Sequence, residues 1–260
     1  MKAATRADAL QLLNKVPEVT LYFWIIKIMA TTVGETAADF LNFDLHFGLG
    51  GTSVVMSVLL MTFLLLQLRA RTYVPWLYWL TVVLISIVGT LVTDNLVDNF
   101  GIALETTTAA FGLALLVTFG VWYAKEKTLS IHTIFTARRE LFYWAAILFT
   151  FALGTAAGDL TAEGLNLGYA TSALIFGGLI GVVTIAYYAF KANAVLSFWI
   201  AYILTRPFGA SMGDYLSQPA ANGGLGLGTV VTSAVFLSTI LSLVIYLTIS
   251  RRDVRESVEA

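Results

Sequence analysis

Four aspartates in this chain occupy one repeated position, fifteen residues after a tryptophan that itself follows an aromatic residue. A glycine stands ten residues after each of these tryptophans. Carboxylates inside apolar segments can bind a hard cation or carry a proton, so these acids are the candidate functional residues. The tryptophans are Trp24, Trp79, Trp144 and Trp199, and the acids are Asp39, Asp94, Asp159 and Asp214.

The segments that carry these acids are long and apolar. Hydrophobic residues make up 58% of the sequence and charged residues only 12%, which excludes an ordinary soluble protein. A membrane helix needs about 20 apolar residues, whereas a membrane barrel would show alternating strands of about ten. The sequence therefore predicts an all-α integral membrane protein with eight transmembrane helices, over residues 21–41, 52–68, 77–97, 106–124, 141–162, 169–190, 195–216 and 229–249.

The distribution of Lys and Arg predicts the orientation in the membrane. Thirteen of the 15 lie before the first segment, after an even-numbered segment or after the last one. The remaining two, Lys27 and Arg206, lie inside segments. By the positive-inside rule both termini are cytoplasmic, in a bacterial cytoplasmic (inner) membrane that the chain crosses several times. All six tryptophans fall at the predicted cytoplasmic ends, as in an aromatic belt.

The spacing of the four tryptophans, 55, 65 and 55 residues, indicates four two-helix repeats. Each repeat crosses the membrane twice, so all four insert in parallel around an axis along the membrane normal. The predicted units are a cytoplasmic N-terminal segment 1–18, repeats over 19–72, 73–127, 141–192 and 193–250, a cytoplasmic loop 128–140 and a cytoplasmic tail 251–260.

The two helices of each repeat differ in charge. Intramembrane charges occur only in the first helices, and each costs roughly 2.5–3.5 kcal/mol at the centre of an inserting helix. The first helices are therefore expected to line the interior. Lys27, Thr31, Glu35 and Asp39 are spaced by four and form one stripe on a helix. The other polar residues expected along this path are Thr32, Ser86, Thr90, Thr155 and Tyr202.

Structural roles compete with functional ones for the same residues. Each aspartate could cap a segment or lie in the headgroup region, and the repeated glycines could serve close helix packing. Arg206 could neutralise Asp214 or an acid of another repeat. Five acids face two bases in these segments, so full pairing leaves acid to spare. That surplus suits a cation or a titratable proton.

A run of motif residues opens the first repeat: Lys15-Val-Pro-Glu-Val-Thr20, Phe23-Trp24, Lys27, Thr31-Thr32, Gly34-Glu35-Thr36 and Asp39. This run resembles a family of bacterial membrane proteins with four tandem repeats of unknown function, and the resemblance covers nearly the whole chain. It implies two transmembrane helices and a characteristic Trp per repeat, and no biochemical activity. The fourth repeat departs from the pattern, with Arg206-Pro207 in place of Thr31-Thr32 and Ala210 in place of Glu35.

The leading hypothesis is a transporter or exchanger for a small cation, with a divalent metal coupled to protons as one case. Glu35 and Asp39 would bind the ion, including a metal, and Asp94, Asp159 and Asp214 would complete the path, with Lys27 and Arg206 as internal counter-ions. The alternatives are a cation channel with a fourfold Asp ring and a non-transporting scaffold or sensor subunit. No enzyme, cofactor or nucleic-acid binding is expected; the partners are the lipid bilayer and a small cation or proton, and an oligomer is compatible with the sequence.

Overall fold

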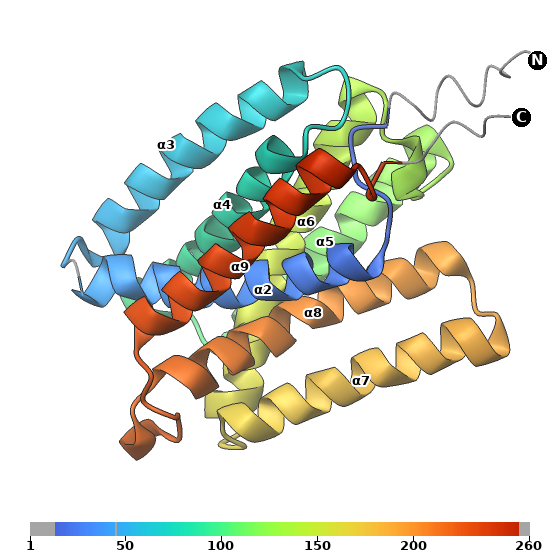
Figure 1. The fold of residues 1–260 in the computed structure, drawn as a ribbon. Helices are drawn as coiled ribbons and strands as arrows, with labels where there is room; N and C mark the ends of the chain where they lie inside the picture. The colour runs from blue at the N-terminus through green and yellow to red at the C-terminus, as the bar shows by residue number, and fades with distance from the viewer. Residues whose placement is uncertain (1–13, 45, 255–260) are drawn as a thin grey trace, which may run out of the picture.

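A computed structural model describes residues 14–44 and 46–254 of the chain. Within these residues the structure is helical and contains no strand (Figure 1). The long helices are α2 (Leu21–Asp39), α3 (Gly48–Arg69), α4 (Pro75–Asp94), α5 (Leu104–Glu126), α6 (Ala137–Asp159), α7 (Tyr169–Phe190), α8 (Ala194–Ser217) and α9 (Thr229–Ser250).

Six helices in the described part of the chain are long and apolar enough to cross a membrane: α3, α4, α5, α6, α7 and α9. The other two long helices, α2 and α8, carry Lys27, Glu35 and Arg206 in their interiors. These features indicate a multi-pass membrane protein in which two charged helices accompany six apolar ones.

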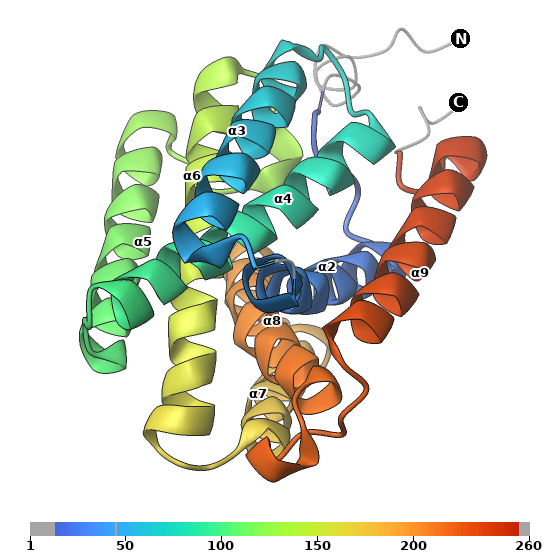
Figure 2. The same cartoon turned by 90° about the vertical axis from the view of Figure 1, so that its left-hand side faces the viewer.

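The helices form an inner group and an outer group (Figures 1 and 2). Four inner helices close a ring in which α2 contacts α4, α4 contacts α6, α6 contacts α8, and α8 contacts α2. Each outer helix packs mainly on the inner helix that follows it: α3 on α4, α5 on α6, and α7 on α8. The last outer helix, α9, packs on the first inner helix, α2, and so completes the arrangement.

Neighbouring inner helices cross at the repeated glycines. A Cβ atom built on each glycine would lie 2.5–2.6 Å from the Cβ atom of a residue on the next inner helix, closer than real side chains approach. That residue stands seven positions after the Trp of its own repeat. Only glycine permits this approach, as expected for small-residue packing in membranes. The crossing pairs are Gly34 with Ser86, Gly89 with Phe151, Gly154 with Arg206, and Gly209 with Thr31.

Hydroxyl pairs join two of the inner helices to their outer neighbours. Thr36 on α2 and Ser233 on α9 lie 2.7 Å apart at their hydroxyl oxygens. Ser211 on α8 and Ser172 on α7 form the corresponding pair, also at 2.7 Å. Both inner-helix residues stand twelve positions after a tryptophan, so the first and fourth repeats use the same position for this contact.

Capping residues explain several helix ends. The side chains of Thr20, Thr136 and Asn193 accept backbone N–H groups at the starts of α2, α6 and α8. Because Thr136 caps α6, this helix begins at Ala137, before the predicted segment 141–162 and inside the predicted loop. Three outer helices, α5, α7 and α9, end at a basic residue in the left-handed conformation, where its charge complements the helix dipole. These residues are Lys127, Lys191 and Arg251.

The predicted aromatic belt is wrong for most of the tryptophans. Trp79, Trp122, Trp144 and Trp199 are at most 4% exposed, while Trp76 is half exposed. The buried rings pack on one another, with centroids 5.8 Å apart for Trp122 and Trp199. They therefore form an aromatic core inside one end of the bundle and do not face the lipid headgroups.

Contacts between distant segments close this aromatic end. Lys15 forms a buried ion pair with Glu140 at 2.6 Å, and Gln67 donates to the same carboxylate at 3.2 Å. Tyr73 donates to Asp253 at 2.6 Å. The described residues before α2 and after α9, the end of α3 and the start of α6 thus meet at one end of the molecule.

Candidate functional site

On each inner helix, the residues at positions −1, +3, +7, +11 and +15 relative to the tryptophan of its repeat share one face, which lies between the four helices. We call this set of residues the axial stripe. Four residues advance a helix by about 6 Å, so the stripes form stacked layers. We name two of these layers by their distance from the tryptophans. The Trp+11 layer contains Glu35, Thr90, Thr155 and Ala210, and the Trp+15 layer contains Asp39, Asp94, Asp159 and Asp214.

An ion pair lies at the centre of the Trp+11 layer. The Nη2 atom of Arg206 lies 3.1 Å from Oε2 of Glu35, and the side chains are 0% and 8% exposed. Arg206 starts one turn closer to the tryptophans and reaches along the axis into the layer. Since a buried charge requires a partner, this pair neutralises the guanidinium that α8 brings into the interior and the Glu35 carboxylate of α2.

The same guanidinium contacts the two remaining inner helices. Its Nη2 atom donates to the hydroxyl of Thr155 at 2.6 Å and also to the hydroxyl of Thr90. Its Nη1 atom donates to the carbonyl of Thr31 at 3.0 Å. Thr90 lies on α4, which is opposite α8 in the ring. Arg206 therefore crosses the axis and links all four inner helices at one level.

Lys27 is the second buried cation of the axial stripe. Its Nζ atom lies 4.1 Å from the centre of the Phe151 ring and 4.2 Å from that of Tyr202. The side chain is fully buried, and Nζ has no hydrogen-bond partner within the described residues. Two ring faces thus take the place of an acid, as in a desolvated cation–π contact. Lys27 and Arg206 are near enough to interact electrostatically.

The acids of the Trp+15 layer lie one turn beyond the Arg206–Glu35 pair. Three of them are half-buried and Asp214 is 7% exposed. Asp94 interacts electrostatically with Glu35, Asp159 and Asp39. Gln218 donates to Asp39 at 3.4 Å. In the part of the chain that the structure describes, no three acidic, His or Cys groups are arranged to hold a metal ion. This layer is a group of closely spaced acidic side chains.

Three of these aspartates end an α-helix at a π-helical turn. Asp39, Asp94 and Asp159 are the last residues of α2, α4 and α6, and each is followed by a five-residue π turn. Such turns are rare and frequently occur at functional sites. The fourth repeat differs, since α8 continues past Asp214 to Ser217. The three turns are η1 (Phe40–Asp44), η2 (Asn95–Asn99) and η4 (Leu160–Gly164).

The structure brings together only some of the residues of the predicted polar path. Thr31, Thr90 and Thr155 surround the Arg206 guanidinium, and Tyr202 contacts Lys27. Ser86 packs against Gly34 at a crossing, and its hydroxyl has no hydrogen-bond partner among the described residues. The Thr32 hydroxyl lies 3.4 Å from the carbonyl oxygen of Ile28 on its own helix and is not part of the axial stripe.

The ion pair of Arg206 differs from one of the two pairings expected from the sequence. The residue that pairs with Arg206 is Glu35, an acid of another repeat, and not Asp214 of its own helix. Sequence reasoning missed Phe151, which helps to enclose Lys27, and Gln218, which contacts Asp39. It also missed the hydrogen bond between Tyr78 and Tyr143, whose oxygens lie 2.5 Å apart. The four-residue spacing places Phe151, Tyr78 and Tyr143 on the axial stripe. Gln218 lies four residues after Asp214, beyond the last position that repeats.

Comparison with known proteins identifies the repeat. No curated protein and no solved structure is significantly similar to this chain. The family model described as a Repeat of Unknown Function (DUF347) matches residues 22–73, 77–128, 142–193 and 197–253. These matches cover most of the sequence and include every residue of the axial stripe from Phe23 to Asp214. The chain therefore belongs to the DUF347 family, with four copies of its repeat.

Proposed function

We propose that this protein is a membrane transporter or exchanger for a small cation, coupled to protons, whose path runs through the acids of the inner helices. One observation carries the proposal: four aspartates occupy one layer, interact electrostatically, and lie one turn from a buried Arg206–Glu35 pair. A layer of like charges attracts a counter-ion, and the neighbouring pair supplies an acid whose partner can change.

The proposed topology has eight transmembrane helices, four parallel repeats and cytoplasmic termini in a bacterial inner membrane. Six helices meet the apolar requirement by themselves. The charged helices α2 and α8 are flanked by other helices on several sides, so their polar residues face protein. Lys15, Arg138, Arg139 and Arg252 lie at the aromatic end, which supports a cytoplasmic position for that end.

The proposed mechanism exchanges partners at Glu35. A cation or proton that enters the Trp+15 layer reduces the repulsion around Glu35 and competes with Arg206 for its carboxylate. Arg206 then depends more on the hydroxyls of Thr90 and Thr155 and on the carbonyl of Thr31. Lys27, which is close to Arg206, limits how far the guanidinium can retreat toward the aromatic end. Ion entry is thereby coupled to the contacts between the inner helices.

The contacts of Arg206 favour a carrier over an open channel. Its guanidinium bridges opposite inner helices, and the rings of Phe151 and Tyr202 enclose Lys27 in the adjacent layer. An ion would have to displace these side chains to pass, which requires a conformational step for each transport event.

Ion flux into proteoliposomes tests the proposal. The purified protein is reconstituted, and uptake of Mn²⁺, Mg²⁺, Ca²⁺, Na⁺ and K⁺ is followed with and without a pH gradient. Asp94→Asn is expected to lower the flux of the transported ion by at least about tenfold, which corresponds to 1.4 kcal/mol of lost stabilisation. Asp98→Asn is the matched control, because Asp98 is an exposed acid four residues away in η2.

The two variants separate the proposal from a structural role. Flux that depends on Asp94, tolerates Asp98→Asn and changes with the pH gradient supports a proton-coupled cation path. Folded protein that moves none of these ions, or an Asp94→Asn variant with wild-type flux, contradicts it. In that case the axial charges would serve a membrane scaffold or sensor subunit, and stable co-purification with one partner would be the next observation to seek.

A further inference from the structure

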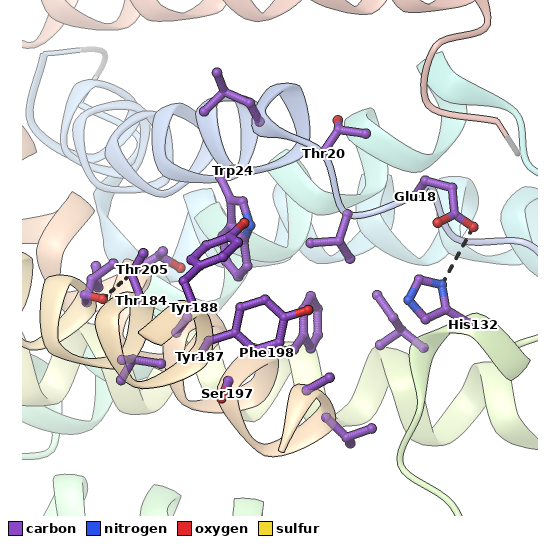
Figure 3. A pocket seen from close by; sticks show the side chains of 18 of the residues that line it. Glu18, Thr20, Trp24, His132, Thr184, Tyr187, Tyr188, Ser197, Phe198 and Thr205 are labelled. Carbon is purple, nitrogen blue, oxygen red and sulfur yellow. Dashed lines mark hydrogen bonds and ion pairs between the residues drawn. The ribbon is translucent and has the colours of Figure 1, made fainter. Parts of the chain in front are cut away.

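A pocket of about 610 Å³ opens at the side of the bundle, away from the Trp+11 and Trp+15 layers (Figure 3). It lies between the start of α2, the second half of α7, the first half of α8 and residues 129–132. This volume suits a small organic molecule, since ligand pockets are typically about 300–1,000 Å³. The pocket is near the aromatic end, where Trp24 and Phe198 belong to the aromatic pairs that open the first and fourth repeats.

Aromatic rings and hydroxyl groups line this lateral pocket. Trp24, Phe198, Tyr187 and Tyr188 contribute the rings, and Figure 3 shows them around the same space. Besides the two tyrosines, the residues with hydroxyl groups are Thr20, Ser130, Thr184, Ser197 and Thr205. Tyr188 is 71% exposed, so it lies at an accessible side of the pocket. The walls therefore offer several ring faces with polar groups between them.

Among the described residues that line the pocket, Glu18 is the acid and His132 is the titratable base. Glu18 supplies a carboxylate and interacts with His132 at 3.6 Å at one end of the pocket (Figure 3). None of the described residues that line the pocket is Lys or Arg. An anionic amphiphile would find no fixed cation here, whereas a cation would find ring faces and a carboxylate.

We propose that the lateral pocket binds a hydrophobic organic cation, of the quaternary ammonium or phosphonium class. Ring faces attract such cations because of their negative quadrupole, and the attraction strengthens when water is excluded. The acid Glu18 adds electrostatic complementarity without requiring a permanent ion pair. This site is separate from the proposed inorganic-ion path and is tested by binding alone.

The floor of the lateral pocket adjoins the axial site. Thr205 lines the pocket, and its carbonyl accepts a hydrogen bond from Thr31 at 3.2 Å. The carbonyl of Thr31 in turn accepts from Arg206. The bound cation would thus lie on the outer side of the α2–α8 crossing, while Arg206 lies on its inner side. This separation provides the control for the experiment, because an axial acid is distant from the pocket lining.

Equilibrium binding of radiolabelled tetraphenylphosphonium to the full chain in phosphatidylcholine nanodiscs tests the inference, with empty nanodiscs as the background. Tyr188→Leu is expected to weaken binding by about fivefold or more, because it removes an accessible ring. Tyr123→Leu is the matched control: Tyr123 is exposed and occupies the corresponding position of α5, outside the pocket. Asp94→Asn should leave the affinity unchanged.

Charge selectivity is the second arm of the test. Tetraphenylborate has a similar shape and the opposite charge, and it is expected to bind at least about tenfold more weakly. Glu18→Gln should reduce this preference for the cation. Equal binding of both probes, or equal loss in Tyr188→Leu and Tyr123→Leu, would overturn the inference, because the pocket would then be a general apolar groove. Failure of ion flux leaves these binding outcomes unaffected, so the two proposals are tested separately.

Discussion

Two adjacent layers of the same four helices differ in how closely their residues match between the four repeats. The Trp+15 layer has an aspartate in every repeat, whereas the Trp+11 layer has Glu35, Thr90, Thr155 and Ala210. One helical turn separates them. The more deeply buried layer is the more varied of the two, and this order follows from the cost of burying charge.

Burial explains why only one acid is tolerated in the Trp+11 layer. Thr90, Thr155 and Ala210 are 0% exposed, and Glu35 is only 6% exposed. Arg206 supplies one positive charge there, so a second carboxylate would lack a partner. In the Trp+15 layer three acids are partly exposed beside π turns and can remain close together. A repeated helix can therefore keep its position in the ring while its buried charges diverge.

The largest expected effect comes from removing the cation of the Trp+11 layer. Arg206→Gln leaves the Glu35 carboxylate buried without its charged partner, which should cost about 3–5 kcal/mol of folding stability. Thermal unfolding of the detergent-solubilised protein measures this loss. The double variant Arg206→Met with Glu35→Leu should recover most of it, because neither charge then remains. An unchanged midpoint in Arg206→Gln would show that the pair does not stabilise the layer.

A smaller loss of folding stability is expected from substitutions at the glycines where the inner helices cross. Gly89→Ala places a Cβ atom 2.6 Å from the Cβ of Phe151 and 3.2 Å from the backbone nitrogen of Ala152. Such overpacking should cost about 1–3 kcal/mol, since the backbone contact cannot move aside. Gly178→Ala in α7 is the control, because open space surrounds that position. Equal unfolding midpoints for the two variants would mean that the crossing is looser than its geometry indicates.

In the Trp+15 layer, removing a charged side chain should raise the stability of the fold instead of lowering it. Asp94 is close enough to four other acids to interact electrostatically with them, so Asp94→Asn should remove repulsion from the ionised members of this group. Stability should rise by about 1 kcal/mol, the scale of two unit charges a few ångströms apart in water. The same variant is expected to lose ion flux, which would separate function from stability. A destabilised Asp94→Asn protein would indicate that this acid holds the helices together, as Glu35 does.

The smallest effect concerns a carboxyl outside the membrane helices, which serves as a reference for the axial acids. Burial raises the pKa of Asp253 above its ordinary value of 3.8, and the Tyr73 hydroxyl partly opposes this shift. The folded chain therefore holds this proton more tightly than the unfolded chain does. Its contribution to stability is greatest below pH 3.8 and falls as the pH rises through the raised pKa. Asp253→Asn should flatten this small decline in unfolding midpoint, and an identical pH profile would contradict it.

The helices and the inward stripe could be predicted from the sequence because membrane helices have strong compositional and periodic signals. The spacing of Lys27, Thr31, Glu35 and Asp39 identifies one helix face without structural information. It does not identify the helix opposite that face, so the pairing of Arg206 with Glu35 is visible only in the folded structure.

Other features left no usable signal in the chain. The π turns follow ordinary sequences, and the lateral pocket combines four segments that are distant in sequence. The prediction of an aromatic belt from the tryptophans was wrong for a physical reason. An indole is equally suited to a headgroup region and to a packed aromatic core. Position at a helix end could not distinguish the two environments.

The packing of each outer helix on the following inner helix has a consequence for biogenesis. Among the eight long helices that the structure describes, α2 is synthesised first, yet α8 and α9, which pack against it, are synthesised last. Lys27 and Glu35 are synthesised long before Tyr202 and Arg206, which contact them in the folded structure. The charged side chains of the first repeat therefore lack these contacts until the fourth repeat has been made. A chain truncated before α8 would therefore leave Lys27 without the Tyr202 ring and Glu35 without the Arg206 guanidinium.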